Sequence, residues 1–517
     1  MRFLFILVIS NCVFFRALAQ EPLERIRVNV QNAQSWAIEW QNEGLDVLEG
    51  SVRSESLELI VTPSTRSELE RAGFFLESLE FGRAGAVPTG YLDLNQINAA
   101  LAAAAMNFPT LCQVVNLTQE FGAPSTAEGR DIFAVKISDS VDLDEDEPVF
   151  LLVSDHHARE IVTPVIALHV MDQLLNLYGV DTNVTRYVNS HEIWIAPVWN
   201  PDGYNYVFTG DNLWRKNRRV FAQGTGVDIN RNYNFGWDSA CGGSSLVGSE
   251  TYRGPSAGSE AETELMELFS SNRQFSKVLD FHSSGRETLF AYQQSCNLHV
   301  HQGYWQSGAL ALSQAGGYGT SVRGPSANGE HYHWQMWAYG NYAFLMETHT
   351  EFQPSFASAQ AEAAQLWPAV ALLLDQEPPL WGHVRDSQTG DPIVADISNL
   401  TDPALNGELQ QSNFRFGRYQ IWVPDGSYDF RFSADGYQSQ TVQVTLVNGT
   451  PLQREIFMGP ICVGDFGTSI GLDVADGSQI VNAFGQNGGP EDLDSSGLVD
   501  LTDLALWLEA WPGSCLD

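Results

Sequence analysis

The run Val149-Phe150-Leu151-Leu152-Val153 contains no polar residue. A strand that is apolar on both faces must be covered on both, as central strands are in a sheet that lies between helices. Three further short, largely apolar strands are expected, at Ile193–Ala196, Val278–Phe281 and Tyr342–Met346. A helix is expected to start at Thr163-Pro164, where a capping residue precedes a proline at the first helical position. The predicted fold is α/β, with a mixed, largely parallel sheet flanked by helices.

The chain has 517 residues, too many for one compact core, and its composition changes along its length. A linker at Arg83–Pro88 and the segment Glu377-Pro378-Pro379 bracket the main α/β unit. Short alternating strands with turn signals such as Thr389-Gly390-Asp391 come next, which is typical of a β-sandwich. The predicted units are a signal peptide (1–19), a small α/β prodomain-like segment (20–85), the main domain (86–376), a β-sandwich (380–459) and a small helical calcium-loop module (460–517).

The first residues have the features of a secretory signal peptide. Arg2 gives a positive start, Phe3 to Phe15 is mostly apolar, and Ala17-Leu18-Ala19 fits the small-x-small cleavage pattern. The apolar run is too short to span a membrane. We therefore expect a secreted, extracellular protein that begins at Gln20, with no membrane insertion.

The charge balance excludes two classes of partner. The formal net charge is −36 at pH 7. Such an acidic surface repels phosphate backbones and anionic lipid. Nucleic acid and membrane surfaces are therefore not expected to bind this chain.

The cysteines are too scattered for a zinc ribbon, and export favours disulfides. Cys462 and Cys515 bracket the last segment and are a candidate pair. Cys241 and Cys296 form a second candidate pair, which leaves Cys112 over. The sequence leaves this connectivity open.

The last segment contains two loops with the ligand pattern of calcium sites. In the second loop, Gly497 stands at position 6, where a sharp turn is needed, and the ligand positions 1, 3, 5, 7, 9 and 12 are Asp492, Asp494, Ser496, Leu498, Asp500 and Asp503. In the first loop, positions 1, 5, 9 and 12 are Asp465, Ser469, Asp473 and Asp476. Gly467 and Ile470 depart from the pattern there, so the first loop is predicted to bind Ca²⁺ more weakly.

The chemistry starts from His157 and Glu160, three residues apart and just after an apolar run. A catalytic zinc site needs three protein ligands and an open position. His282 supplies a third ligand at the end of another apolar run. Open α/β sheets place their sites beyond the carboxyl ends of the strands, where these residues and Glu347 would meet.

Six segments of this sequence resemble the metallocarboxypeptidase family of carboxypeptidase A (peptidase family M14). They are His157-Ala158-Arg159-Glu160, Asn200-Pro201-Asp202-Gly203-Tyr204, Trp214-Arg215-Lys216-Asn217-Arg218, Gly226-Val227-Asp228-Ile229-Asn230-Arg231-Asn232, Tyr252-Arg253-Gly254-Pro255-Ser256 and Phe281-His282-Ser283. They occur in the family's order and at similar spacing, over roughly residues 90–376. The resemblance implies the zinc carboxypeptidase fold and one catalytic Zn²⁺; carboxypeptidase A itself is a known zinc enzyme with two His ligands and one Glu ligand.

The resemblance also implies a role for each matching residue. His157, Glu160 and His282 match the zinc ligands, and Asp228 matches the acid that orients the first His. Glu347 matches the general base, which takes a proton from the zinc-activated water and passes it to the leaving amine. The remaining matches are the oxyanion-stabilising Arg218, the carboxylate clamp of Asn230 and Arg231, and the secondary substrate-binding Arg159 and Arg215.

One part of the family pattern is missing. The family usually has a Tyr on a loop over the substrate, and Pro325 occupies that position in this sequence. The Trp that the family has nine residues later is present as Trp334. Tyr332 occupies the position that usually determines which C-terminal side chain of the substrate the enzyme prefers. A Tyr there favours an apolar or aromatic C-terminal residue. His156, beside a predicted ligand, is interpreted as structural.

Together these matches predict a secreted zinc metallocarboxypeptidase that acts on peptides and proteins with a free C-terminus. Residues 20–85 look like the family's propeptides, residues 380–459 resemble its regulatory-like β-sandwich, and the last segment resembles a dockerin, which implies a cohesin-type partner. Three alternatives stay open: a calcium-stabilised tail without a partner, an inactive family member that serves binding or adhesion, and a zinc amidase or peptidase acting on cell-wall peptides.

Overall fold

The computed structural model describes residues 23–48, 51–79, 86–291, 293–294, 297–298, 301–325, 327–402, 410–460 and 474–510. The predicted signal peptide lies outside these residues, as do Asp465, Ser469 and Asp473 of the first predicted calcium loop. Cys296, Cys462 and Cys515 lie outside them too. Cys241 is disulfide-bonded, and Cys112 is a buried free thiol whose pKa burial raises to about 12.

An eight-stranded mixed sheet forms the centre of the molecule, in the order β15-β12-β16-β11-β7-β8-β6-β5. Its strands are β5 (Cys112–Asn116), β6 (Phe133–Ile137), β7 (Val149–Ser154), β8 (Glu192–Ala196), β11 (Lys277–Ser283), β12 (Glu287–Leu289), β15 (Val322–Arg323) and β16 (Tyr342–Thr348). The four apolar runs are β16, β11, β7 and β8, which lie side by side and run parallel. Antiparallel pairing enters on either side of them, at β12–β16 and at β8–β6–β5. The predicted mixed α/β sheet is confirmed.

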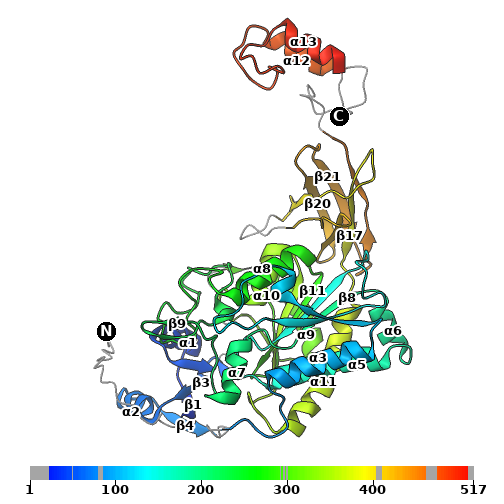
Figure 1. The fold of residues 1–517 in the computed structure, drawn as a ribbon. Helices are drawn as coiled ribbons and strands as arrows, with labels where there is room; N and C mark the ends of the chain where they lie inside the picture. The colour runs from blue at the N-terminus through cyan, green and yellow to red at the C-terminus, as the bar shows by residue number, and fades with distance from the viewer. Residues whose placement is uncertain are drawn as a thin grey trace.

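Helices cover both faces of this sheet (Figure 1). They are α3 (Leu94–Asn107), α4 (Leu117–Glu120), α5 (Val162–Leu177), α6 (Thr182–Val188), α7 (Pro201–Thr209), α8 (Ala261–Arg273), α9 (Gln302–Ala315), α10 (His331–Tyr339) and α11 (Phe356–Asp375), with a short 3-10 turn η2 (Ile229–Arg231). Helix α11 packs against α5 and α9, and α10 packs on β11 and β16. Two short hairpins complete this unit, β9 (Val220–Phe221) with β10 (Gly224–Thr225) and β13 (Gln293–Gln294) with β14 (Asn297–Leu298).

The predicted start of helix α5, with Thr163 as the cap and Pro164 as the first helical residue, is wrong by two residues. The helix begins at Val162, after Ile161, which makes no side-chain capping bond. The Thr163 hydroxyl instead donates to the Glu160 carbonyl oxygen at 2.9 Å, as the loop after β7 turns into the helix. Thr163 therefore does not cap the helix, because the tight turn that carries Glu160 already places it inside the first helical turn.

The N-terminal residues form an antiparallel sheet, β2-β3-β1-β4, with two helices and a core of their own. The elements are β1 (Glu24–Asn29), α1 (Ala33–Glu43), β2 (Asp46–Leu48), β3 (Ser56–Val61), α2 (Pro63–Arg71) and β4 (Leu76–Leu79). Leu48 and Ile60 of this unit pack against Phe352 of the main α/β unit. We call residues 23–79 the N-terminal unit.

After the main unit come two small sheets with a shared core, one of β19-β17-β22 with β23 also paired to β17, and one of β18-β20-β21. Their strands are β17 (Leu380–Asp386), β18 (Asp396–Asn399), β19 (Arg418–Ile421), β20 (Gly426–Ser433), β21 (Gln440–Leu446), β22 (Leu452–Gln453) and β23 (Ile456–Met458). Helices α12 (Val474–Ala483) and α13 (Leu501–Ala510) follow and pack on each other. In Figure 1 they lie beyond the two small sheets, at the end of the molecule away from the N-terminal unit.

The small sheets contact the main unit through aromatic and ionic groups. Trp422 stacks on Tyr342 with 4.3 Å between the ring centroids. His383 lies between two carboxylates, with Nε2 2.7 Å from Asp146 of the main unit and Nδ1 3.0 Å from Glu455. The hydrogen bond to Asp146 and then that to Glu455 raise the pKa of His383 against the lowering effect of burial.

This raised pKa predicts that the contact strengthens as the pH falls. A histidine whose pKa is higher in the folded than in the unfolded state contributes its full stability below the unfolded value of about 6.5, and loses it as the pH rises through the folded value. We expect His383→Gln to lower the free energy of unfolding by about 1.5 kcal/mol at pH 6 and by less at pH 8.5. Thermal unfolding of both proteins across this range measures the difference, and a difference that is constant with pH would contradict it.

No helix among the described residues is both long enough and apolar enough to cross a membrane.

Candidate metal centre and its surroundings

The predicted metal ligands come from the carboxyl ends of two neighbouring parallel strands. His157 and Glu160 lie in the loop between β7 and α5, and His282 is near the end of β11. All three side chains are buried. Parallel pairing explains their convergence, because the chain leaves β7 and β11 at the same edge of the sheet.

The ligand atoms of these residues converge on one point. Nδ1 of His157 is 2.9 Å from Glu160 Oε1 and 3.0 Å from Nδ1 of His282, and the latter is 3.1 Å from Glu160 Oε2. With each Nε2 donating elsewhere, both Nδ1 atoms present lone pairs, as do the carboxylate oxygens. Acceptors that face one another in a buried site need a cation between them. Two imidazoles and one carboxylate are a donor set that suits zinc.

A carboxylate stands behind each of the two imidazoles. His157 Nε2 is 3.1 Å from Asp228 Oδ1, and His282 Nε2 is 3.3 Å from Asp280 Oδ1. Such partners fix the tautomer and orientation of a metal-binding His.

Glu347 lies beside this centre on the next strand. It pairs with His282 in the parallel register of β11 and β16, so the two side chains share one face of the sheet. Glu347 also lines the same pocket as His157 and Glu160. Its Oε1 is 3.8 Å from Nη2 of Arg323, whose Nε donates to Glu287 at 2.8 Å. An acid in this place can exchange protons with a molecule held at the centre.

Asn230 and Arg231 lie on η2, next to the centre. The Asn230 amide nitrogen is 3.4 Å from His282 Nε2, and its Oδ1 accepts the His331 backbone N–H at 2.8 Å. Arg231 Nη1 donates to the Asn230 carbonyl at 2.7 Å and is 3.3 Å from Glu330. The Asn230 amide therefore lies beside the second predicted metal-binding imidazole, and the Arg231 guanidinium lies between the Asn230 carbonyl and the carboxylate of Glu330.

Arg159 and Arg215 are engaged by acidic side chains. Arg215 donates through Nε and Nη2 to Asp228 Oδ2, at 3.1 and 2.8 Å. Arg159 donates through both terminal nitrogens to Asp46 of the N-terminal unit, at 2.6 and 2.9 Å. Its predicted substrate-binding position is thus taken by a residue of the same chain.

Two predicted site residues are not brought to the metal centre by any contact of the described residues. Arg218 donates to Glu128 at 3.2 Å and lies over the rings of Tyr206 and Trp214. Tyr332 is fully buried beside His333 on α10. The roles assigned to both from the sequence stay predictions.

The N-terminal unit covers the centre. Val47 and Leu48 of β2 line the same pocket as His157 and Glu347. The Ser249 hydroxyl donates to the Gln41 carbonyl at 3.1 Å, and the backbone carbonyl of Thr350 accepts from Arg25 at 3.3 Å. The unit therefore borders the site through apolar side chains, an ion pair and hydrogen bonds.

The second predicted calcium loop gathers carboxylates. Ligand atoms of Asp492, Asp494 and Asp503 lie within 4.8 Å of one another. Gly497 has φ +91°, which only glycine adopts readily, and its N–H donates to Asp492 at 2.8 Å. Ser496, Leu498 and Asp500 lie in the same loop, whereas Asp476, the one described ligand of the first loop, is buried in α12.

Sequence reasoning missed Asp46, Asp280, Arg323 and His331. Asp280 had a usable signal, because residues two apart on a strand share a face and Asp280 precedes His282 by two. The other three had none, since each reaches the site from a distant segment.

Comparison with known proteins identifies the fold and the family. Residues 97–367, just over half of the chain, match the family described as zinc carboxypeptidase. A metallocarboxypeptidase A of Trichophyton rubrum is 34% identical over 34% of this chain and 42% of its own length. Zinc carboxypeptidase A 1 of Drosophila melanogaster is 30% identical over 55% of this chain and 67% of its own. The yeast relative named inactive metallocarboxypeptidase ECM14 is 31% identical over 40% of this chain and 48% of its own.

Two solved structures share the fold. Carboxypeptidase A from Helicoverpa armigera has a TM-score of 0.58 and 22% identity, over 68% of this chain and 96% of that one. Thrombin activatable fibrinolysis inhibitor has a TM-score of 0.56 and 19% identity, over 68% of this chain and 98% of that one. With the family match over residues 97–367, the chain belongs to the zinc carboxypeptidase family.

Proposed function

We propose that this protein is a secreted zinc metallocarboxypeptidase that hydrolyses the C-terminal peptide bond of peptides and proteins. One observation carries the proposal: the ligand atoms of His157, Glu160 and His282 converge, and Asn230, which precedes Arg231 in the chain, lies 3.4 Å from His282. A planar guanidinium bonds both oxygens of a carboxylate, so this pair favours substrates with a free C-terminus over internal bonds.

His157, Glu160 and His282 would hold the zinc ion. A zinc ion in such a site supplies acidification of a water molecule and polarisation of the scissile carbonyl. Glu347 would accept the proton of that water and deliver it to the leaving amine, since it borders the same pocket. Arg231 and Asn230 would fix the terminal carboxylate, and Arg218, after turning from Glu128, would stabilise the developing oxyanion.

Metal removal tests the proposal. The purified protein, cleaved between residues 79 and 86 and freed of the N-terminal unit, should release single residues from a free peptide end. Dialysis against a chelator should lower this rate at least about 100-fold, because the three ligands leave no other source of an activated water. One equivalent of Zn²⁺ should restore the rate. Release that persists without metal would refute a zinc mechanism.

The remaining segments extend this proposal. The resemblances of residues 380–459 and 460–517 favour a regulatory-like β-sandwich and a dockerin-like module that binds one or two Ca²⁺ and a cohesin-type partner. The carboxylates of Asp492, Asp494 and Asp503 support a hard cation in the second loop. A tail that is stabilised by Ca²⁺ without a partner is the alternative for this module.

The inactive yeast relative gives a specific reason to keep a second candidate function, a catalytically inactive protein that serves binding or adhesion. The three predicted ligands, Glu347 and the Asn230–Arg231 pair are all present in this chain, which favours activity. Cleavage of cell-wall peptides by the same zinc chemistry is the third candidate. A panel of peptide and cell-wall fragments separates these three.

A further inference from the structure

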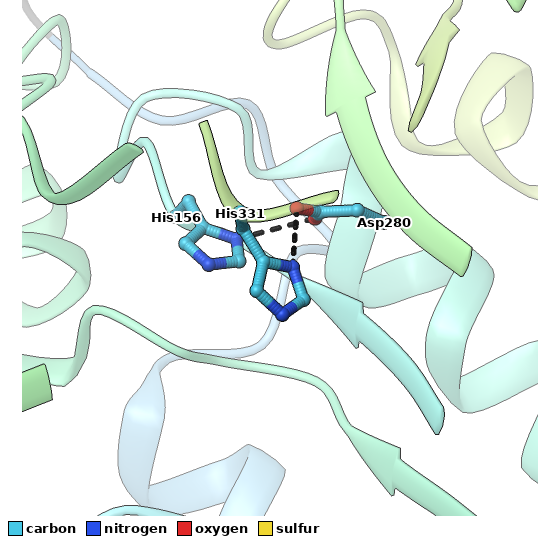
Figure 2. A group of neighbouring side chains, drawn as sticks. All are labelled: His156, Asp280 and His331. Carbon is cyan, nitrogen blue, oxygen red and sulfur yellow. Dashed lines mark hydrogen bonds and ion pairs between the residues drawn. The ribbon is translucent and has the colours of Figure 1, made fainter. Parts of the chain in front are cut away.

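Behind the metal centre lies a second cluster of buried polar groups, formed by His156, Asp280 and His331 (Figure 2). Asp280 is on β11, His156 is in the loop after β7, and His331 is the first residue of α10. All three side chains are fully buried. The carboxylate of Asp280 points between the two imidazoles, as Figure 2 shows.

Each imidazole of this cluster has a partner for both nitrogens. His156 Nδ1 lies 3.2 Å from Asp280 Oδ1, and its Nε2 lies 3.1 Å from the Tyr233 hydroxyl. His331 Nδ1 lies 3.0 Å from Asp280 Oδ2, and its Nε2 lies 3.0 Å from the Gln335 amide nitrogen. The Gln335 amide and the Tyr233 hydroxyl can both donate, so each Nε2 accepts and each Nδ1–H donates to Asp280.

This match of hydrogen-bond donors and acceptors argues against a second metal ion at the cluster. The carboxylate of Asp280 already accepts from both imidazoles, and the four ring nitrogens are all used in hydrogen bonds between protein groups. A cation bound by all three side chains would have to break the two hydrogen bonds from the imidazoles to Asp280 and displace two protons. The arrangement is instead complete with the side chains alone.

Asp280 also contacts a third imidazole, that of the predicted metal ligand His282. Its Oδ1 lies 3.3 Å from Nε2 of His282, whose Nδ1 faces His157 and Glu160. The rings of His156 and His282 are stacked, 17° from parallel with 5.5 Å between centroids. A proton on His282 Nε2 that is donated to Asp280 leaves Nδ1 with its lone pair toward the centre, the form that binds a metal.

We propose that Asp280 is a positioning residue for the zinc site, which fixes the tautomer and ring orientation of His282 and is itself held by His156 and His331. The inference rests on the proposed zinc function. It also reaches the proposed carboxylate clamp, because the His331 backbone N–H donates to Oδ1 of Asn230 at 2.8 Å and so holds the Asn230 amide beside His282. One buried carboxylate thus couples the metal ligand to the group that anchors the substrate.

The test measures zinc affinity, by competition with a fluorescent chelator, in the full chain and in three variants. Asp280→Asn should weaken zinc binding about 10- to 100-fold, because the amide cannot accept all three donors. His331→Phe should weaken it less, since two donors still hold Asp280. In the double variant the loss should equal that of Asp280→Asn alone within about 2-fold, because His331 acts only through Asp280.

Glu192→Gln is the matched control. Glu192 is also a buried carboxylate with several donors, among them Trp194 Nε1 at 2.7 Å and Lys136 Nζ at 3.0 Å, but it lies at the opposite end of the sheet, on the first residue of β8. This variant should lose stability and keep its zinc affinity and its kcat.

The outcomes separate the two claims. A native chain that binds no zinc would refute the proposed function. A native chain that binds zinc, with equal affinity in Asp280→Asn and His331→Phe, would overturn the positioning role alone. Two zinc equivalents per chain that fall to one in His331→Phe would overturn it as well and establish a second metal site. If Asp280→Asn does not fold, His331→Phe decides by itself, with the loss in affinity predicted and its absence contradictory.

Discussion

Glu347→Gln is expected to lower kcat by about 1,000-fold or more while the zinc content stays at one per chain. The amide keeps the size of the side chain but cannot accept the proton of the attacking water, and proton transfer by a positioned side chain contributes about 100- to 10,000-fold. Glu347 sits directly across from His282 in the register of β16 and β11, and it lines the same pocket as His157 and Glu160. KM should change little, because Glu347 acts in the transition state.

Glu351→Gln serves as the control, since Glu351 is an exposed acid four residues further along the chain. Its kcat should equal that of the native enzyme. Native activity in Glu347→Gln, measured with zinc bound, would show that another group acts as the base. A parallel loss of zinc would show instead that Glu347 supports the metal.

Removal of the N-terminal unit should raise kcat/KM at least about 100-fold. Val47 and Leu48 line the pocket of the metal centre, and Asp46 holds both terminal nitrogens of Arg159. Substrate has to displace this unit, and breaking a largely buried ion pair costs about 3 kcal/mol, equivalent to roughly 100-fold in the population of the open state. Cleavage between residues 79 and 86 followed by gel filtration gives the two forms to compare.

Single substitutions separate the ion pair from the rest of the interface. Asp46→Ala in the full chain should raise kcat/KM by up to about 100-fold, because it removes the ion pair from which the cost of opening is estimated. The control is Glu77→Gln. Glu77, on β4, forms an ion pair with Arg27 inside the N-terminal unit, so its replacement should leave kcat/KM unchanged. Equal activity of the full and cleaved forms would mean that the unit does not restrain the enzyme.

The sequence predicted the centre of the fold well, because its information is local there. The apolar runs at β7, β8, β11 and β16 are buried on both faces, and only a covered parallel strand has that pattern. The ligand set could be predicted for a related reason. His157 and His282 follow directly after such strands, and parallel strands end at one edge of the sheet.

What the sequence did not predict depends on contacts between distant segments. Asp46 pairs with a residue 113 positions away, and His331 with one 51 positions away. No periodicity or motif in the sequence predicts such contacts between distant segments. The partners of Arg218 were not predicted either: Glu128 comes from a segment 90 positions away, and the role that the motif assigns to Arg218 stays a prediction.

The central claim is tested most directly by mass spectrometry of paired peptides that differ only in a free or an amidated C-terminus. The enzyme freed of its N-terminal unit should shorten the free peptide by one residue at a time and leave the amidated peptide intact. In the proposed mechanism Asn230 and Arg231 bind the terminal carboxylate, and replacing it with an amide removes the charge that they would bind. Cleavage of both peptides at equal rates, or cleavage at internal bonds, would contradict the assignment as a carboxypeptidase.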